Sequence, residues 1–320
     1  MILQNILQQG CRIFCGFKDN MNLLAFNIDY ILNTLSIGGV YAIIAIGYTM
    51  VYGILRLINF AHADMFMMAG MFMISAAASF GIYVAIPATI LFTAVLGIII
   101  EKIAYKPLRN EPRMSAMVSA IAVSYFLVYL ANYIWTAIPK PFPDIPFLTK
   151  QISLFGKVRP VAVIVRPIVT VLLVALLLAL IKKTKFGIAM RASSKDFEAA
   201  SLMGVKVNKV VSTTFAIGSA LAAIGAILYF ADHPQVFPTT GGSIGLKCFV
   251  AAVFGGIGSI PGAVVGGFVI AFFEVLFTSF FTQWIPQISL FSDAFTFILL
   301  IVILIVKPTG LFGEKLQEKV

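Results

Sequence analysis

The run IYVAIPATILFTAVLGIII, residues 82–100, contains no charged side chain. A helix needs about 20 mostly apolar residues to cross the hydrocarbon core of a bilayer, which is roughly 30 Å thick. Comparable runs recur from Asp29 to Lys307. The whole chain of 320 residues is 60% hydrophobic and 11% charged, against about 25% charged residues in a soluble domain. The sequence therefore predicts a polytopic protein embedded in a lipid bilayer, with no room for a second, soluble domain.

Breaks between the apolar runs predict six long spans, a broken region and a final run. The six spans are Tyr30–Leu55, Ala63–Gly81, Ile82–Ile100, Met114–Ile138, Val161–Ile181 and Val210–Phe230. In the broken region the first apolar stretch, Leu246–Ile257, covers only roughly 18 Å before the sequence GSIPG at 258–262. The expected fold is all-α, a transmembrane helix bundle of about 8–9 membrane segments with a broken or re-entrant helical pair near residues 246–281.

Basic residues indicate which loops face the cytoplasm, because Lys and Arg are enriched on that side. Assigning Arg56, the loops Glu101–Arg113 and 182–209, and the C-terminal tail to the cytoplasm puts 15 of the 23 basic residues there. This assignment requires the region 246–281 to cross twice or to enter and return. The net charge of +10 is explained by this orientation, so no nucleic-acid partner is expected.

The expected domain organisation is an N-terminal extension over 1–28, a transmembrane permease domain over 29–313 with a cytoplasmic loop at 182–209, and a cytoplasmic tail at 314–320. The N-terminus lacks the pattern of a secretory signal, so the extension is either dispensable or a misassigned start. The three cysteines form no metal-binding pattern. They are Cys11, Cys15 and Cys248.

No phosphate-binding G-x-x-x-x-G-K-[ST] motif and no common hydrolase or zinc motif occurs in the chain. We therefore expect no catalytic residues, no metal and no cofactor on this chain. If transport is active, its energy must come from an ion gradient or from another polypeptide. The proline-rich segment Pro139–Pro160 is expected to be extended and extracytoplasmic. It is either a docking surface or a solvated connector.

The cytoplasmic loop contains a helix pattern. Ser193 or Ser194 can cap a short amphipathic helix that runs to Leu202, and Gly204 supplies its stop. Phe197 and Leu202 would need an apolar partner, either the underside of the bundle or another protein.

Four motifs in order give the chain a family resemblance. They are GYTMVYGI at 47–54, INFAH at 58–62, AAVFGGIGSIPGA at 251–263 and PTGLFG at 308–313, together with Glu198-Ala199-Ala200 followed by Gly204. The last string resembles the E-A-A loop of ABC importer permeases. The set is similar to the branched-chain amino acid permeases of the LivH type over roughly Tyr30 to Gly313. One departure is Ala63-Asp64 after His62, where the family commonly has Gly-Glu.

The resemblance implies the permease subunit of an importer for branched-chain amino acids or related small solutes, driven by ATP hydrolysis on separate subunits. The implied partners are a second homologous permease chain, two ATP-binding subunits and an extracytoplasmic substrate-binding protein. The implied location is the inner membrane of a bacterium or archaeon, with a cytoplasmic C-terminus. The residues implied for the ATPase coupling helix are Arg191, Ser194, Asp196, Glu198, Ala199, Ala200 and Gly204.

Polar residues within or beside the spans are candidates for the translocation path, because such groups usually face the bundle interior or a cavity. The candidates of this kind are Asn59, His62 and Glu274, and the backbone exposed at the break from Ser259 to Gly262 is a further candidate. Each has a structural explanation too. Asn59, His62 and Asp64 suit an interfacial turn, Glu274 suits a buried acid paired to a neighbouring helix, and the glycines around 262 suit close helix packing.

Two other classes compete with this interpretation. A gradient-driven secondary transporter for small solutes also has broken helices and polar groups near the membrane midplane, but it has no need for a glycine-stopped cytoplasmic helix. A membrane-embedded enzyme should show clustered His, Asp or Glu, and the chain has only two histidines, His62 and His233.

Overall fold

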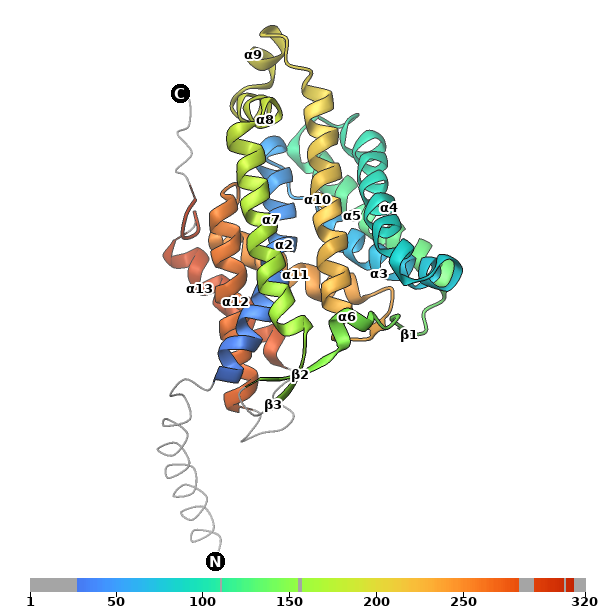
Figure 1. Ribbon diagram of the computed structural model, residues 1–320. Helices are drawn as coiled ribbons and strands as arrows, with labels where there is room; N and C mark the ends of the chain where they lie inside the picture. Colours follow the sequence, from blue (N-terminus) through green and yellow to red (C-terminus); the bar gives the residue numbers. More distant parts are fainter. Residues whose placement is uncertain (1–27, 110, 155–156, 282–290, 308, 314–320) are drawn as a thin grey trace, which may run out of the picture.

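The computed structural model describes residues 28–109, 111–154, 157–281, 291–307 and 309–313 (Figure 1). The predicted tail, the predicted N-terminal extension apart from residue 28, and two of the three cysteines therefore lie outside the described residues.

Helices dominate the described chain, in the order α2 Ile28–Leu55, α3 His62–Phe80, α4 Ile82–Ile100, π-helix η1 Glu101–Tyr105, α5 Arg113–Trp135, α6 Pro146–Thr149, α7 Ala162–Lys183, α8 Lys185–Lys195, α9 Phe197–Leu202, α10 Val207–Phe230, α11 Thr240–Gly255, α12 Ile260–Phe281 and α13 Ser292–Val306. The strands are β1 Lys140–Pro141, β2 Gln151–Leu154, β3 Lys157–Pro160 and β4 Gln235–Val236. They form two small antiparallel pairs, β1 with β4 and β2 with β3.

The helical, polytopic bundle is confirmed, but the number of spans is lower than predicted. Seven helices in the described part of the chain are long and apolar enough to cross a membrane. The predicted 8–9 segments included α11 and α13, which are apolar but have only 16 and 15 residues. At 1.5 Å per residue, 16 helical residues cover roughly 24 Å, less than a full hydrocarbon core.

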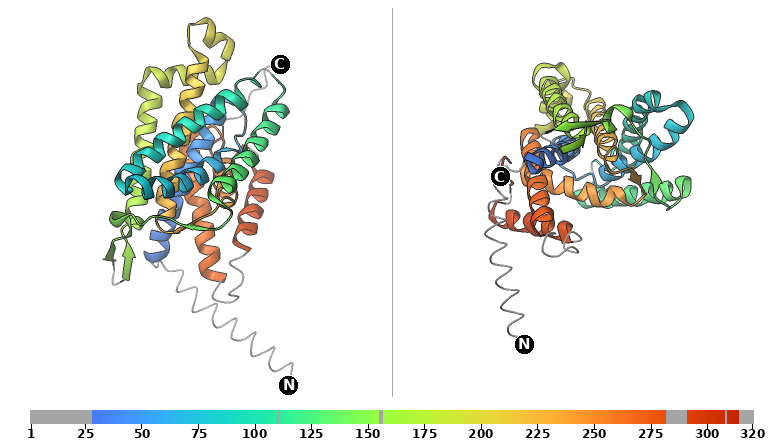
Figure 2. Two further views of the ribbon diagram at one scale, coloured as in Figure 1. Left: turned by 90° about the vertical axis from the view of Figure 1, so that its right-hand side faces the viewer. Right: turned by 60° about the horizontal axis from the view of Figure 1, so that its bottom comes forward.

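Helix α2 forms the centre of the bundle. It packs against α7, α10, α11 and α12, and its residues from Val40 to Ile46 are all buried. The views in Figure 2 place the α3–α4–α5 group on one side of α2 and α13 on the other. The outward faces of α4, α5, α7 and α13 carry exposed apolar side chains, as expected for surfaces that meet lipid or another membrane chain.

The non-helical link between α2 and α3 runs from the exposed Arg56 into the interior of the protein. Arg56, with φ of 53°, ends α2, and the next helix begins only at His62. Asn59 and Ala61 in this link are 2% and 0% exposed. Irregular backbone is tolerated at membrane depth only where protein covers it or where it lines a cavity, so this link marks a specialised region of the bundle.

The two ends of the bundle differ. Figure 1 shows α8 and α9 at one end, and the strands β1 to β3 with α6 at the other. Arg56 and Arg109 both reach the α8–α9 end, because Arg56 donates to the carbonyl of Ser194 at 3.5 Å and Arg109 donates to Asn208 at 2.7 Å. Arg56, the loop at 101–113 and the loop at 182–209, which were predicted to share one side, therefore meet at one end of the molecule; the predicted tail lies outside the described residues.

The predicted break near residues 258–262 is a tight turn between α11 and α12. Gly256 and Gly258 occupy it with φ of 104° and 102°, values that side chains rarely allow. A Cβ on Gly255 or Gly262 would run into the backbone of the other helix, so these glycines permit close packing. Beyond α13, the chain returns to this turn.

The segment at 309–313 supplies hydrogen-bond donors for the last carbonyls of α11. The backbone N–H groups of Leu311 and Phe312 donate to the carbonyls of Phe254 and Gly255, both at 2.9 Å. The last carbonyls of a helix have no partner within the helix, so the segment at 309–313 supplies the partners that a buried helix end needs.

At the opposite end, the predicted extended segment Pro139–Pro160 is partly different from the expectation. It contains the short helix α6 as well as strands. One proline of the segment, Pro146, is the first residue of α6. At this position the missing N–H of proline costs nothing, because the N–H there has no partner within the helix. Proline therefore excluded a long helix but not a single turn.

Candidate coupling and translocation sites

Helices α8 and α9 owe their boundaries to two capping side chains. The Thr184 hydroxyl accepts a hydrogen bond from the backbone N–H of Gly187 at 3.1 Å and starts α8. One carboxylate oxygen of Asp196 accepts from the N–H groups of Glu198 and Ala199 at 2.9 and 3.0 Å and starts α9. These bonds satisfy N-terminal amides that a short helix otherwise leaves free.

The prediction that Ser193 or Ser194 caps the short helix was wrong. Both serines lie inside α8, and the Ser194 hydroxyl donates to the Arg191 carbonyl at 2.9 Å. The sequence pattern suggested one helix, whereas the extended conformation of Asp196 divides the segment into two. Aspartate is as good a capping residue as serine, and Asp196 lies nearer to the apolar residues of the helix.

The predicted glycine stop is where the sequence placed it. Gly204 has φ of 83°, its N–H donates to the Ser201 carbonyl at 2.9 Å, and the Val205 N–H donates to the Ala200 carbonyl at 3.0 Å. This paired arrangement is the Schellman motif, which requires a left-handed residue at the helix end.

The tip of α9 exposes apolar side chains. Leu202 and the following Met203 are 89% and 85% exposed, while Ala200 is buried. Glu198 and Ala199 are exposed as well. Figure 1 shows α9 standing away from the bundle. Apolar side chains that are this exposed, on a helix fixed by caps at both ends, are typical of a docking surface.

An open groove of about 980 Å³ lies beside α9. Its lining comes from α9, the start of α10 and Arg109. Of the predicted coupling residues, Glu198 and Gly204 line it. Arg191 lies on α8 and its guanidinium contacts the Ile181 carbonyl.

Arg109 joins this end to α4. Its guanidinium donates to Glu101 at 2.9 Å and to Asn208 at 2.7 Å, and it lies 6.0 Å from the centre of the Phe197 ring. Glu101 is completely buried and accepts a second hydrogen bond, from Ser212 at 2.6 Å. Sequence reasoning placed Glu101 and Arg109 in a loop and missed both as functional residues. The usable signal was an acidic residue directly after the 19-residue uncharged run at 82–100.

The start of α3 brings two predicted path residues together. Asn59 accepts a hydrogen bond from Tyr105 at 2.6 Å, and the backbone N–H of His62 donates to the Asn59 carbonyl at 3.2 Å. The His62 ring packs edge-on against Tyr48 with centroids 4.7 Å apart. The explanation of a turn exposed to water is wrong, because Asn59 and His62 are 2% and 1% exposed.

Buried polar atoms at this point remain unsatisfied. Asn59 Nδ2, His62 Nε2 and Asp64 Oδ2 have no hydrogen-bond partner among the described residues. Such atoms usually cost about 1–3 kcal/mol each, so each of them in a folded protein calls for an explanation. Gly47 makes room for the imidazole, because a Cβ there would overlap the His62 ring.

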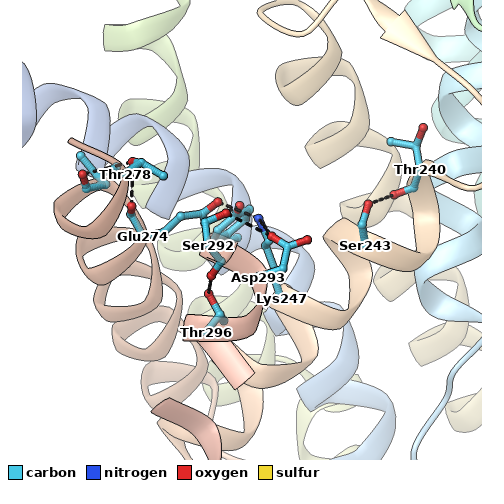
Figure 3. A network of polar contacts seen from close by, with 10 residues as sticks. Thr240, Ser243, Lys247, Glu274, Thr278, Ser292, Asp293 and Thr296 are labelled. Atoms are coloured by element: carbon cyan, nitrogen blue, oxygen red, sulfur yellow. Dashed lines mark hydrogen bonds and ion pairs between the residues drawn. The ribbon is translucent and has the colours of Figure 1, made fainter. Parts of the chain in front are cut away.

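Glu274 lies in a different place, in the ionic network of Figure 3. Lys247 of α11 contacts both Glu274 of α12 and Asp293 of α13 at 2.7 Å. Tyr41 of α2 donates to the other oxygen of Glu274 at 2.8 Å. The acid therefore links α12 to α2 and α11, and Lys247 extends the network to α13, as the helix-pairing explanation of the sequence required. Lys247, which sequence reasoning did not single out, is the centre of the network.

The five predicted path residues are thus divided among three places. Asn59 and His62 lie together, Glu274 lies in the Lys247 network, and Ser259 and Gly262 lie at the α11–α12 turn. The Ser259 hydroxyl accepts a bond from the Gly262 N–H at 3.3 Å. No group of three His, Cys, Asp or Glu within the described ranges could hold a metal ion.

These features define a class of protein: a polytopic helical membrane protein with a buried polar site at a helix break and a capped helix presented at one end. Residues 30–306 match the family described as the permease component of branched-chain amino acid transport systems. The chain belongs to this family of transport permeases.

Individual relatives cover almost the whole chain. It is 35% identical to the high-affinity branched-chain amino acid transport permease BraD of Pseudomonas aeruginosa, over 92% of this chain and 98% of that protein. It is 35% identical to LivH of Salmonella typhimurium, over 92% and 97%. The probable branched-chain amino acid permease of Methanocaldococcus jannaschii is 28% identical, over 85% and 88%. These names support transport, not catalysis, as the role of the chain.

Proposed function

We propose that this chain is the membrane permease subunit of an ATP-driven importer of branched-chain amino acids. It would act with a second homologous permease chain, two ATP-binding subunits and an extracytoplasmic substrate-binding protein, in the inner membrane of a bacterium or archaeon. The end that carries α8 and α9 is the cytoplasmic end in this proposal, because the basic segments gather there.

The observation that carries the proposal is α9. A six-residue helix capped at one end by Asp196 and stopped at the other by Gly204 would be unstable in isolation, and its Leu202 and the following Met203 face outward. Such a helix suits a groove on another protein. A secondary transporter would need no such surface, which is why the ATP-driven reading is favoured over a gradient-driven one.

We further propose that Asn59 and His62 border the translocation path. Their unsatisfied, buried atoms lie where α3 begins inside the bundle, and broken helices bind solutes in many transporters. An amino acid offers a carboxylate and an ammonium group that could satisfy such atoms. Ser259, Gly262 and Glu274 stay predicted path residues, and their packing and ionic contacts provide the competing explanation.

Co-purification tests the partner assignment. The chain is expressed with its candidate ATP-binding subunits and second permease, isolated through a tag, and compared with the double variant Leu202→Glu, Met203→Glu. We expect the native chain to retain the ATP-binding subunits and the variant to lose them while keeping the second permease. Lys185→Gln, an exposed change on the same end, is the control. Retention of the ATP-binding subunits by the double variant would contradict the role of α9.

A further inference from the structure

Arg109 is one of the residues through which α9 meets the membrane bundle, beside the packing of α9 on α8 and α10. It contacts Phe197 of α9 on one side and Glu101 and Asn208 on the other. Its side chain is only 16% exposed, so these contacts are partly shielded from water. A planar guanidinium that bonds two partners holds its orientation better than an ammonium group does. Movement of α9 would therefore be felt by the groups that Arg109 binds.

Glu101 is the next contact inward and opens an unusual helical turn. Residues Glu101–Tyr105 form a π-helix that continues α4, with the Lys106 N–H donating to the Glu101 carbonyl at 2.8 Å. Single π-helical turns occur frequently at functional sites. Glu101 is completely buried, and a buried carboxylate needs its charged and hydroxyl partners, here Arg109 and Ser212.

Tyr105 closes the same π-turn and reaches the start of α3. Its ring packs on Phe215 with centroids 5.2 Å apart, and its hydroxyl donates to Asn59 at 2.6 Å. The backbone carbonyl of Asn59 in turn accepts a hydrogen bond from the backbone N–H of His62 at 3.2 Å. Continuous contacts therefore lead from α9 to the unsatisfied polar atoms at the helix break.

One face of α10 runs beside these contacts. Asn208, Ser212, Phe215 and Gly218 are spaced by three or four residues, which places them along one side of a helix. They meet Arg109, Glu101, Tyr105 and His62 in that order. Because the two orders agree, α10 acts as a support along which the neighbouring groups are aligned.

We propose that Arg109, Glu101 and Tyr105 are positioning residues that transmit movement of α9 to the non-helical link at 56–61 and to His62. The inference rests on the proposed function. In this mechanism, displacement of α9 moves the Arg109–Glu101 pair. The π-turn, which holds one residue more than an α-helical turn, then shifts its position along the helix formed by α4 and η1. Each helical residue corresponds to a rotation of about 100°, so Tyr105 would leave Asn59 and release the start of α3.

The test uses the complete importer in proteoliposomes, with leucine-loaded binding protein outside and ATP at the other face. The variants are Tyr105→Phe, which removes a single oxygen, and Arg109→Gln. We expect both to assemble and to keep basal ATP hydrolysis. The number of leucine molecules imported per ATP hydrolysed should fall at least about fivefold, the lower range of coupling between linked sites. A merely structural role would change thermal stability and assembly but not this ratio.

Matched controls are Tyr125→Phe, a tyrosine that is 62% exposed on α5, and Lys106→Gln, an exposed basic residue near Arg109 in the chain. Both should match the native importer. If Arg109→Gln fails to assemble, Tyr105→Phe decides the question. If the native importer imports leucine and Tyr105→Phe imports as many leucine molecules per ATP hydrolysed as the native protein does, the proposed transmission through Tyr105 is wrong. Absence of ATP-dependent import by the native complex would instead reject the proposed function.

Discussion

At the scale of single residues, the region around His62 depends on a missing side chain. Gly47 of α2 faces the His62 imidazole and the carbonyl of Gly218 on α10. Helices α2 and α10 therefore both approach the start of α3 closely. The same reasoning does not apply to Gly53, further along α2, where an added Cβ would meet nothing nearer than 4.0 Å. Two glycines of one helix therefore offer a matched comparison.

Gly47→Ala should destabilise the protein by about 1–3 kcal/mol, because the added methyl group overpacks a closed region. The expected result is a lower melting temperature for the purified protein in detergent, together with reduced leucine uptake. Gly53→Ala should melt within a degree or two of the native protein. Equal melting temperatures for all three proteins would show that the start of α3 is not packed as described.

Glu274→Gln distinguishes a helix tie from a path residue. Tyr41 can still donate to the amide oxygen, and Lys247 keeps Asp293, so the contacts predict a loss of about 1 kcal/mol and most of the uptake retained. Thermal melting and leucine uptake are measured on the same preparation. Loss of uptake at an unchanged melting temperature would place Glu274 on the translocation path instead.

At the scale of elements, the helical spans could be predicted because their apolar runs were long and uncharged. The Gly204 stop was equally accessible, since glycine suits the left-handed residue after a helix. The residue that caps α9 could not be predicted, because Asp196 and Ser194 are both good capping residues. Only the turn between α8 and α9 decides between them. The burial of Asn59 and His62 was also hidden, because α10 and α11 cover the start of α3 from far along the chain.

Helix α9 provides the prediction at this scale. Glu198→Lys reverses a charge at the surface proposed to bind an ATP-binding subunit, and Gly204→Trp forces a side chain into φ of 83°, a conformation that costs about 1–2 kcal/mol for other residues. Both should abolish leucine uptake while the chain still inserts into the membrane. Gly242→Ala, at a glycine with open space around it, serves as the control. Normal uptake in both α9 variants would remove the coupling role.

At the scale of the whole molecule, the two ends of the bundle should face opposite compartments. Single cysteines at exposed positions test this in a background without the three native cysteines. Lys195→Cys on α8 and Lys307→Cys after α13 should react with an impermeant thiol reagent only from the cytoplasmic side, and Phe147→Cys on α6 only from outside. Labelling of position 307 from outside would contradict the cytoplasmic location of the C-terminus.

The energy source of transport tests the central claim most directly. The importer is reconstituted with its proposed partners, and uptake of radiolabelled leucine is measured with and without ATP, and with ionophores that collapse ion gradients. We predict that uptake requires ATP and the binding protein and is unchanged by the ionophores. Uptake that continues without ATP and stops when the gradients collapse would contradict the claim, and would identify a gradient-driven transporter.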